Sequence, residues 1–205
     1  MSEEKDINLG EIRKRYQPLR ERTDRILRDS GISEGPEFRK ARKKFTKEAY
    51  LAGIDEVTLL PIRSLFETRL QEELDRSERN GEPLTMGLID LNLLRKINKK
   101  GLPEGDKALR AVAEKILASI RRTDYAARYG GDEFAVLFPG LDVKDINAWW
   151  TRFYTEMQAI PYTVTASAMT IDRKNQSEVR TRLSNNIKQT KELNGHKSNS
   201  FLMAA

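Results

Sequence analysis

The stretch Arg128-Tyr129-Gly130-Gly131-Asp132-Glu133-Phe134 decides the fold of this chain. It lies between two strand-like runs, residues 123–127 and 134–138, and Pro139-Gly140 ends the second run. Strand-like runs joined by Gly-Gly predict a β-hairpin, because glycine reaches positive φ angles without steric cost. The turn carries two adjacent carboxylates, Asp132 and Glu133. Because neighbouring carboxylates repel each other, the pair indicates a bound cation unless both are simply solvated.

The composition limits the cellular setting and the class of partner. The chain has 205 residues, enough for one α/β domain and an additional segment. It contains no cysteine, which excludes disulfides and thiolate metal sites and fits a reducing cytoplasm. No apolar run is long enough to span a bilayer, so we expect a cytoplasmic protein with no membrane span. The net charge of +6 suits an anionic partner, but a nucleic-acid partner would rest on charge alone, and none is expected.

Residues 1–52 are predicted to form a helical segment distinct from a domain at residues 53–205. Side chains recur there in alternating steps of four and three, which is typical of a coiled-coil seam: Ile12, Tyr16, Leu19, Thr23 and Ile26. Pro18 lies within this stripe, so a helix kinks or begins there. Two interpretations stay open: surface helices that pack on the main domain, and a dimerisation or signal-relay segment.

From Ile54 onward, strands and helices alternate around the central hairpin. A helix is expected at 65–80, with Asn80-Gly81 as its end, and a buried strand at 84–91. A short helix follows from about residue 93, and a longer one covers about 106–122. Further elements are a helix from about Val143, a strand at 162–171, a helix at 177–193 and a short strand at Phe201. This order predicts an α/β fold with a central sheet of mixed direction, flanked by helices.

Two acids from separate elements form the candidate metal site. Asp90 ends the strand at 84–91, and Asp132 lies on the hairpin turn. Hard oxygen ligands that converge from two elements suit Mg²⁺ when the ion also carries substrate phosphates. Asp90 taken alone has a simpler explanation as a helix cap.

The Arg-Tyr-Gly-Gly-Asp-Glu-Phe string resembles the signature hairpin of the GGDEF family, the diguanylate cyclases. The run from Asp55 to Arg63, Asp-Glu-Val-Thr-Leu-Leu-Pro-Ile-Arg, is similar to that family's entry motif Asp-x-Leu-Thr-Gly-Leu-Pro-Asn-Arg, with Leu59 and Ile62 as departures. The resemblance covers about residues 54–205. It implies a palm-like nucleotidyl-cyclase fold with an N-terminal helical extension.

The resemblance also implies a set of site residues. Mg²⁺ or Mn²⁺ would be bound by Asp90, the carbonyl of Leu91, Asp132 and Glu133, and Glu133 is assigned either to metal binding or to activation of the ribose 3′-hydroxyl. Asp90, Asp132 and Glu133 would thus be the catalytic acids. The GTP-binding positions would be Asn98 and Asp106 at the guanine, Arg95 and Lys191 at the phosphates, and Gly130 and Gly131 on the turn. A carboxylate at Asp106 suits guanine because adenine lacks the matching pair of donors. As isolated residues, Asn98 would end a helix and Asp106 would cap one.

Arg121 and Asp124 match the family's Arg-x-x-Asp inhibitory site, at which dimeric cyclic di-GMP arrests the enzyme. An arginine can present two parallel donors to a phosphate or a guanine edge. The alternative is a local ion pair at the end of a helix.

Several positions depart from the family pattern. Asn92 replaces the second acid of Asp-x-Asp, the loop after Asn98 is one residue shorter, and Asn186-Ile187-Lys188 stands where the family has Ala-Leu-Tyr. Lys197 aligns with the late arginine only through an insertion, and His196 is interpreted as a surface residue. We therefore predict a diguanylate cyclase that condenses two GTP into cyclic di-GMP as a homodimer. The alternative is a catalytically weak domain that binds cyclic di-GMP or GTP as an effector.

Overall fold

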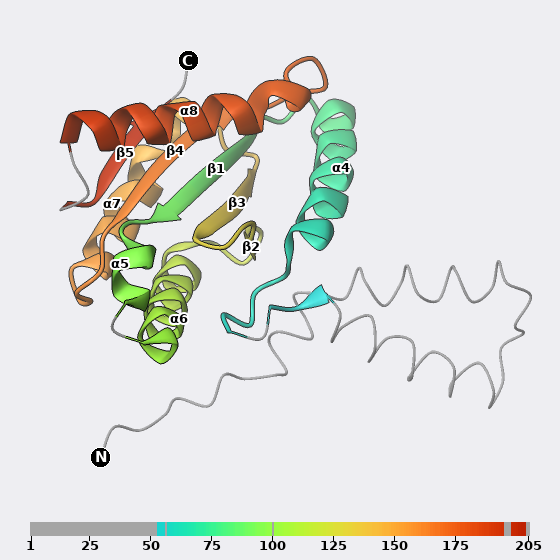
Figure 1. Cartoon of the computed structure of the whole chain (residues 1–205). Helices are drawn as coiled ribbons and strands as arrows, with labels where there is room; N and C mark the ends of the chain where they lie inside the picture. Colours follow the sequence, from blue (N-terminus) through green and yellow to red (C-terminus); the bar gives the residue numbers. More distant parts are fainter. Residues whose placement is uncertain (1–52, 56, 100, 195–197, 204–205) are drawn as a thin grey trace, which may run out of the picture. The chain divides into compact units, whose positions relative to one another are not determined.

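The computed structural model describes residues 53–55, 57–99, 101–194 and 198–203 (Figure 1). The predicted helical segment at 1–52, together with His196 and Lys197, lies outside the described residues. Contacts divide the chain into two compact units, residues 1–54 and 55–205, and the second unit contains every element named below.

The centre of the domain is a five-stranded sheet in the order β2-β3-β1-β4-β5. All neighbouring strands are antiparallel except β4 and β5, which are parallel, so the prediction of a mixed sheet is confirmed. The strands are β1 (Leu84–Leu91), β2 (Tyr125–Arg128), β3 (Glu133–Pro139), β4 (Val164–Thr170) and β5 (Ser200–Met203).

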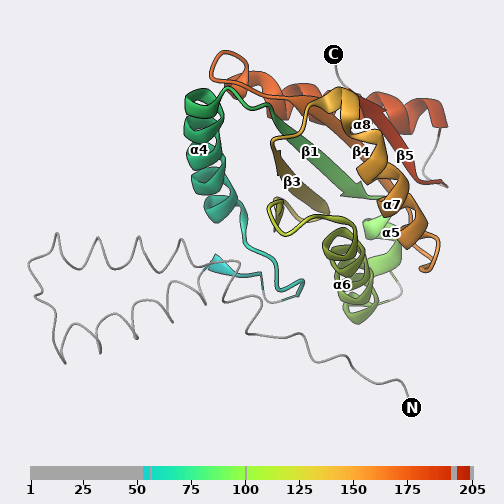
Figure 2. The ribbon, with the colours of Figure 1, turned by 180° about the vertical axis from the view of Figure 1, so that it is seen from behind.

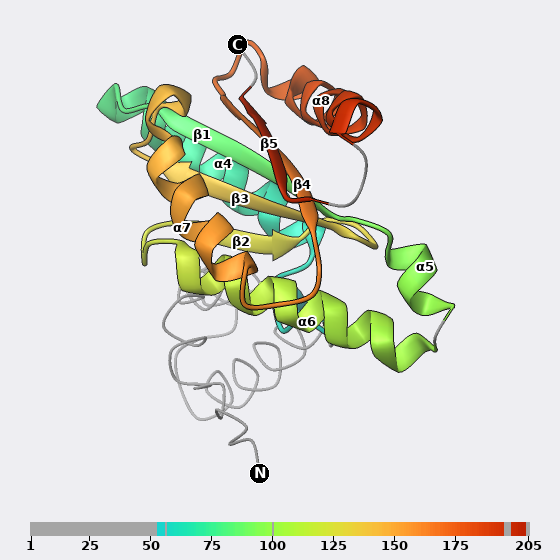
Figure 3. The same ribbon diagram turned by 90° about the vertical axis from the view of Figure 1, so that its left-hand side faces the viewer.

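Helices cover both faces of this sheet (Figure 3). One face packs against α6 (Leu102–Ser119) and α7 (Asn147–Met157), which Figure 2 shows from their own side. The other face packs against α4 (Arg63–Asn80) and α8 (Gln176–Asn194). The short helix α5 (Leu94–Asn98) follows the end of β1, and a 3₁₀ turn, η1 (Val143–Asp145), precedes α7. No helix within the described ranges is long and apolar enough to cross a membrane.

The pleat of the strands decides which side chains face which helices. In β1, Leu84, Met86 and Leu88 pack toward α4 and α8, whereas Ile89 and Leu91 pack toward α6 and α7. Since side chains alternate between the two faces of a strand, Asp90 must face the α8 side. The same argument applies to Glu133, because Ala135 and Leu137 of β3 belong to the α4 and α8 side.

The hairpin forms as predicted, but its glycines act differently. The prediction that Gly130 and Gly131 use positive φ angles is wrong, because the described glycines with positive φ are Gly81, Gly101 and Gly140. The turn spans four residues instead, and the amides of Tyr129 and Gly130 both donate to the carbonyl oxygen of Glu133, at 2.8 and 3.0 Å. A Cβ at Gly130 would lie 2.9 Å from Glu133 Oε2, so a larger residue there would make the carboxylate of Glu133 move.

The helix predicted at 106–122 begins four residues earlier and ends three residues earlier than expected. Pro103 lies in its first turn, where proline is favoured because its fixed φ suits a helix and no amide hydrogen is needed. Asp106 is therefore inside α6, and the prediction that it caps the helix is wrong. The adjacent tryptophans of α7 differ in burial, because neighbouring helical residues point about 100° apart: Trp149 is 2% exposed, and Trp150 is only partly buried.

Candidate active site

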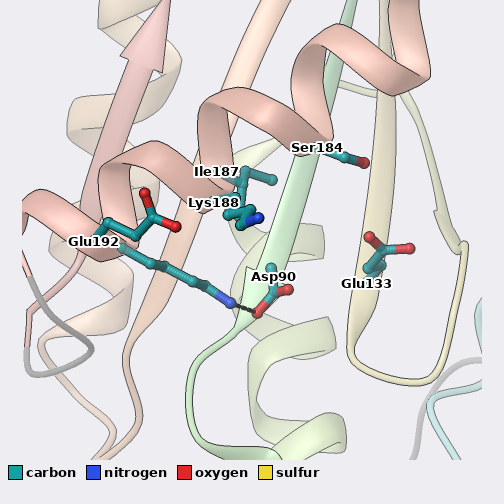
Figure 4. Close-up of a pocket in the computed structure, with 7 residues that line it drawn as sticks. Asp90, Glu133, Ser184, Ile187, Lys188 and Glu192 are labelled. Carbon is teal, nitrogen blue, oxygen red and sulfur yellow. Dashed lines mark hydrogen bonds and ion pairs between the residues drawn. The ribbon is translucent and has the colours of Figure 1, made fainter.

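Asp90 and Glu133 lie side by side where β1 and β3 meet. The two residues are direct partners in the antiparallel register, and both side chains line a cavity of about 370 Å³ beneath α8 (Figure 4). The remaining lining residues all come from α8: Ser184, Ile187, Lys188, Lys191 and Glu192. The strand register therefore supplies two carboxylates to one wall, and the helix supplies two ammonium groups to the other.

Lys191 pairs with Asp90 across this cavity, and both side chains are mostly buried. Burial raises the pKa of Asp90 to about 6, although the hydrogen bond and charge of Lys191 act in the opposite direction. The charges of Asp132 and Glu133 raise this pKa further. Asp132 lies on the turn directly before Glu133 and, unlike Asp90 and Glu133, is not among the residues that line the cavity.

The turn that carries Asp132 is held by backbone and side-chain bonds from two directions. The amide of Leu91 donates to the carbonyl oxygen of Asp132 at 2.9 Å, and Arg128 Nη2 donates to the carbonyl oxygen of Gly131 at 2.8 Å. The same guanidinium donates to both carboxylate oxygens of Asp55, at 3.0 and 2.9 Å. Burial favours a raised pKa for Asp55, but hydrogen bonds from Thr58 and Arg128 bring the pKa below its ordinary value.

This connection between the entry motif and the hairpin was missed by the sequence analysis. Asp55 belongs to the entry motif and Arg128 to the hairpin motif, and nothing in either motif predicts a contact between them. Their opposite charges were the one signal available, and charge alone does not identify a pair that is 73 residues apart.

Tyr129 is linked to Glu133 through its backbone amide and through Arg180, which contacts both residues. Its ring is 6% exposed and lies under two guanidinium groups, with Arg63 Cζ at 4.8 Å and Arg180 Cζ at 5.5 Å from the ring centroid. Arg180 Nη2 lies 3.9 Å from Glu133 Oε2. Burial, followed by the hydrogen bond to Glu67, raises the pKa of the Tyr129 hydroxyl to about 12.

The two predicted guanine-binding residues come from consecutive helices. Asn98 ends α5 as expected, and Asp106 lies in α6. A Cβ built on Gly105 would lie 1.7 Å from Asn98 Oδ1, so the amide of Asn98 rests directly on the backbone of Gly105. The shortened loop therefore still brings Asn98 next to the residue that precedes Asp106. Arg95 lies exposed on α5.

Asn92, which stands where the family has a second acid, is buried and used by the fold. Its Nδ2 donates to Thr163 Oγ1 at 3.1 Å, and its Oδ1 accepts from Thr165 Oγ1 at 2.9 Å. Both oxygen and nitrogen of this side chain are thus directed at β4 and its preceding loop, which accounts for an uncharged residue at this position.

Arg121 and Asp124 are close, but their contact is not the side-chain ion pair that was the alternative to an inhibitory site. Asp124 Oδ2 accepts from the backbone amide of Arg121 at 2.7 Å, and the amide of Asp124 donates back to the carbonyl oxygen of Arg121. Asp124 is 4% exposed, and burial raises the pKa of its carboxyl. The side chain of Arg121 is exposed beside this turn.

Within the described ranges, no group of three or more His, Cys, Asp or Glu side chains is placed to hold a metal ion. The donor set nevertheless fits a hard cation, because Asp90 and Glu133 are paired in the register and the repulsion among the acids would be relieved by positive charge. Mg²⁺ commonly takes only one or two carboxylates and completes its shell with water and phosphate oxygens.

The fold and this site together define a GGDEF domain. Residues 52–177 match the family model described as diguanylate cyclase, GGDEF domain, and the chain belongs to that family. Helix α8, with Lys188 and Lys191, follows the matched range almost entirely.

Relatives and solved structures agree with this assignment. The chain is 29% identical over 153 residues to the diguanylate cyclase DgcP of Pseudomonas aeruginosa, which covers 74% of this chain and 22% of DgcP. It is 39% identical over 94 residues to the diguanylate cyclase TpbB of the same species, which covers 45% of this chain and 22% of TpbB. The chain thus spans about a fifth of the length of these two relatives.

The structure of the coiled coil and GGDEF domain of DgcB from Caulobacter crescentus, in complex with c-di-GMP, superposes with a TM-score of 0.74 at 21% identity. That match covers 88% of this chain and 98% of the DgcB chain, and it shows the fold. The GGDEF domain of TpbB gives a TM-score of 0.67 at 26% identity, covering 74% of this chain and 94% of that domain.

Proposed function

We propose that this chain is an active diguanylate cyclase, which condenses two GTP molecules into cyclic di-GMP and releases two pyrophosphates. One observation carries the proposal: the register of β1 against β3 sets Asp90 opposite Glu133, and both line a cavity with lysines on its other wall. Carboxylates for a cation and ammonium groups for phosphates are the two components that phosphoryl transfer needs.

Mg²⁺ or Mn²⁺ would be held by Asp90, the carbonyl of Leu91, Asp132 and Glu133. When bound, the ion supplies charge neutralisation on the phosphate oxygens and lowers the pKa of the attacking hydroxyl. Lys191, which pairs with Asp90, would then be free to contact phosphate together with Arg95. Asn98 and Asp106 would hold the guanine, and Gly130 and Gly131 of the turn would also contact the nucleotide.

In each half-reaction a 3′-hydroxyl oxygen forms a bond to the α-phosphorus of the other nucleotide. The bond from that phosphorus to the bridging oxygen breaks, pyrophosphate leaves with the electron pair, and Glu133 would receive the hydroxyl proton. Because each protomer presents one GTP, ring closure requires a homodimer, at least transiently.

The product assay tests this proposal. Purified protein is incubated with GTP and Mg²⁺, and the nucleotides are separated by chromatography. Cyclic di-GMP is expected from the wild type and at least about 100-fold less from Asp132→Asn, because a lost charge stabiliser costs several kcal/mol of barrier. Asp142→Asn, on a surface turn, is the matched control and should retain activity. Equal product from wild type and Asp132→Asn would overturn the metal assignment.

A regulatory effector is the second candidate. Arg121 is exposed beside the buried Asp124, and structures of similar fold, such as DgcB, are described in complex with c-di-GMP. Calorimetry with cyclic di-GMP should show binding that Arg121→Ala abolishes. An active cyclase carrying this substitution should also show a longer linear phase of synthesis, whereas an effector has no synthesis to prolong. Absence of binding to wild-type protein stripped of nucleotide would remove both the inhibitory site and the effector.

A further inference from the structure

Lys188 is a second lysine on the helical wall of the cavity, and no specific ligand contact has been assigned to it above. It lies three residues before Lys191 on α8, so both side chains leave the same face of the helix. Ser184 lies one turn earlier on that face. Figure 4 shows Lys188 on α8 above Asp90 and Glu133. The helical wall therefore carries a hydroxyl, two ammonium groups and, next to Lys191, the carboxylate of Glu192.

The two lysines differ in whether a carboxylate balances their positive charge. Lys191 is mostly buried and pairs with Asp90. Lys188 is exposed, and it forms no hydrogen bond or ion pair with any residue that the structure describes. A positive charge with no protein partner, on the wall of a cavity whose acids are proposed to bind a cation, has an anion as its natural ligand.

The sequence supports the same conclusion. Lys188 stands where the resembled pattern has an aromatic residue, so at this wall an apolar side chain is replaced by a charge. Packing does not require that charge, because the neighbouring Ile187 is the residue of this turn that enters the core, at 5% exposure. A lysine can extend its ammonium group along an apolar surface into open space, which here is the cavity.

We propose that Lys188 is a further phosphate-binding residue of this cavity and contacts the polyphosphate of the bound nucleotide. Its position next to Lys191 allows the two ammonium groups to share one chain of phosphates, with Lys191 released from Asp90 when a cation occupies the acids. The inference rests on the proposed function for the identity of the nucleotide, but polyphosphate binding can be measured without guanine or catalysis.

The test is calorimetric titration of the full chain with inorganic tripolyphosphate in the presence of Mg²⁺. Lys188→Gln keeps an unbranched polar side chain, one atom shorter, and removes its charge, and we expect affinity about tenfold weaker than wild type. Lys188→Arg should restore most of the affinity. The matched control is Lys174→Gln, which removes the same charge from an exposed lysine before the start of α8, about 18 Å or more along the helix from Lys188. That control should bind like wild type.

Steady-state kinetics with GTP provide a second readout. Lys188→Gln should raise KM about tenfold and leave kcat within about twofold, because a contact made equally in ground and transition states affects binding only.

Equal tripolyphosphate affinity in wild type, Lys188→Gln and Lys174→Gln would overturn the inference, and so would absence of binding to wild type. Binding that depends on Lys188 in a protein that makes no cyclic di-GMP would retain the inference and reject the cyclase. Synthesis of cyclic di-GMP with unchanged tripolyphosphate binding in Lys188→Gln would retain the cyclase and reject the inference about Lys188.

Discussion

Asp90 is the residue whose charge depends most directly on the state of the cavity. Its folded-state pKa of about 6 lies above the ordinary value of 3.8, since burial disfavours the carboxylate and Asp132 and Glu133 repel it. In metal-free protein the folded state therefore binds more protons than the unfolded state between those two pH values. Stability must fall as pH rises through this window.

The first prediction follows from that sign. We consider the free energy of unfolding of metal-free wild type relative to that of Asp90→Asn. This difference should favour wild type most strongly near pH 4. It should decline by up to about 3 kcal/mol by pH 7, as measured by urea denaturation across the range. Mg²⁺ should restore stability above pH 6, where the proton no longer competes for the carboxylate. A pH profile identical in the two proteins would show that Asp90 is not titrating.

Asp106 carries the second prediction at this scale, the choice of base. Wild type should prefer GTP to ATP by at least about 100-fold. Adenine offers no pair of donors to the Asp106 carboxylate, and leaving that carboxylate unpaired weakens the binding of ATP. Asp106→Ser should reduce that preference by about tenfold or more, as measured by competition between the two nucleotides. Asp145→Ser, on η1, is the control. An unmutated protein that uses both nucleotides equally would contradict the guanine assignment.

At the scale of elements, helices α5 and α6 form one unit through Gly105. The side-chain oxygen of Asn98 occupies the space that any Cβ at position 105 would need. This contact places the predicted guanine-binding residues together even though the loop between them is one residue short.

Gly105→Ala should therefore separate binding from folding. The added methyl must displace Asn98, and we expect GTP affinity to fall about tenfold in calorimetry. Stability should change by less than about 1 kcal/mol, because alanine is the better helix former by a similar amount. Glu114→Ala, exposed on the same helix, is the control. Wild-type affinity in Gly105→Ala would show that Asn98 does not contact the nucleotide.

The link from Asp55 through Arg128 to Gly131 joins the entry segment to the hairpin turn. Both side chains of the ion pair are less than a fifth exposed. Asp55→Asn should cost about 2 kcal/mol in the free energy of unfolding, less than a fully buried pair and more than a surface one. The surface pair Asp142–Lys144 is the comparison, and Asp142→Asn should cost under about 0.5 kcal/mol in the same urea titration. Equal costs would mean that Arg128 holds the turn without Asp55.

Most elements were predictable because they depend on local patterns, whereas Asp90, Asp132 and Glu133 were named through the resemblance to the GGDEF motif. β1 and β3 are buried on both faces and appear as continuous apolar runs, and Gly81 ends α4 through its left-handed backbone. Two kinds of feature were not predictable. The start of α6 depended on Pro103 rather than on the acid at 106, and neither glycine of the turn has the positive φ that its sequence suggested. Pairs such as Asp55–Arg128 and Lys191–Asp90 exist only after the sheet forms, because their partners are far apart in sequence.

At the scale of the whole molecule, the proposed reaction requires two copies of the domain. One cavity with one pair of acids at the register of Asp90 and Glu133 can present one nucleotide, whereas cyclic di-GMP contains two. The prediction that residues 1–52 promote dimerisation concerns residues outside the described range, and deleting them should lower the dimer fraction in light scattering.

The central claim is tested most directly by measuring cyclic di-GMP and pyrophosphate together from GTP and Mg²⁺ over a range of protein concentrations. The proposed mechanism predicts two pyrophosphates per cyclic di-GMP, with a specific activity that rises with protein concentration until the dimer is saturated. Asp132→Asn should show neither product. A wild-type protein that binds GTP or cyclic di-GMP yet releases no pyrophosphate at any concentration would contradict the claim and identify the domain as an effector.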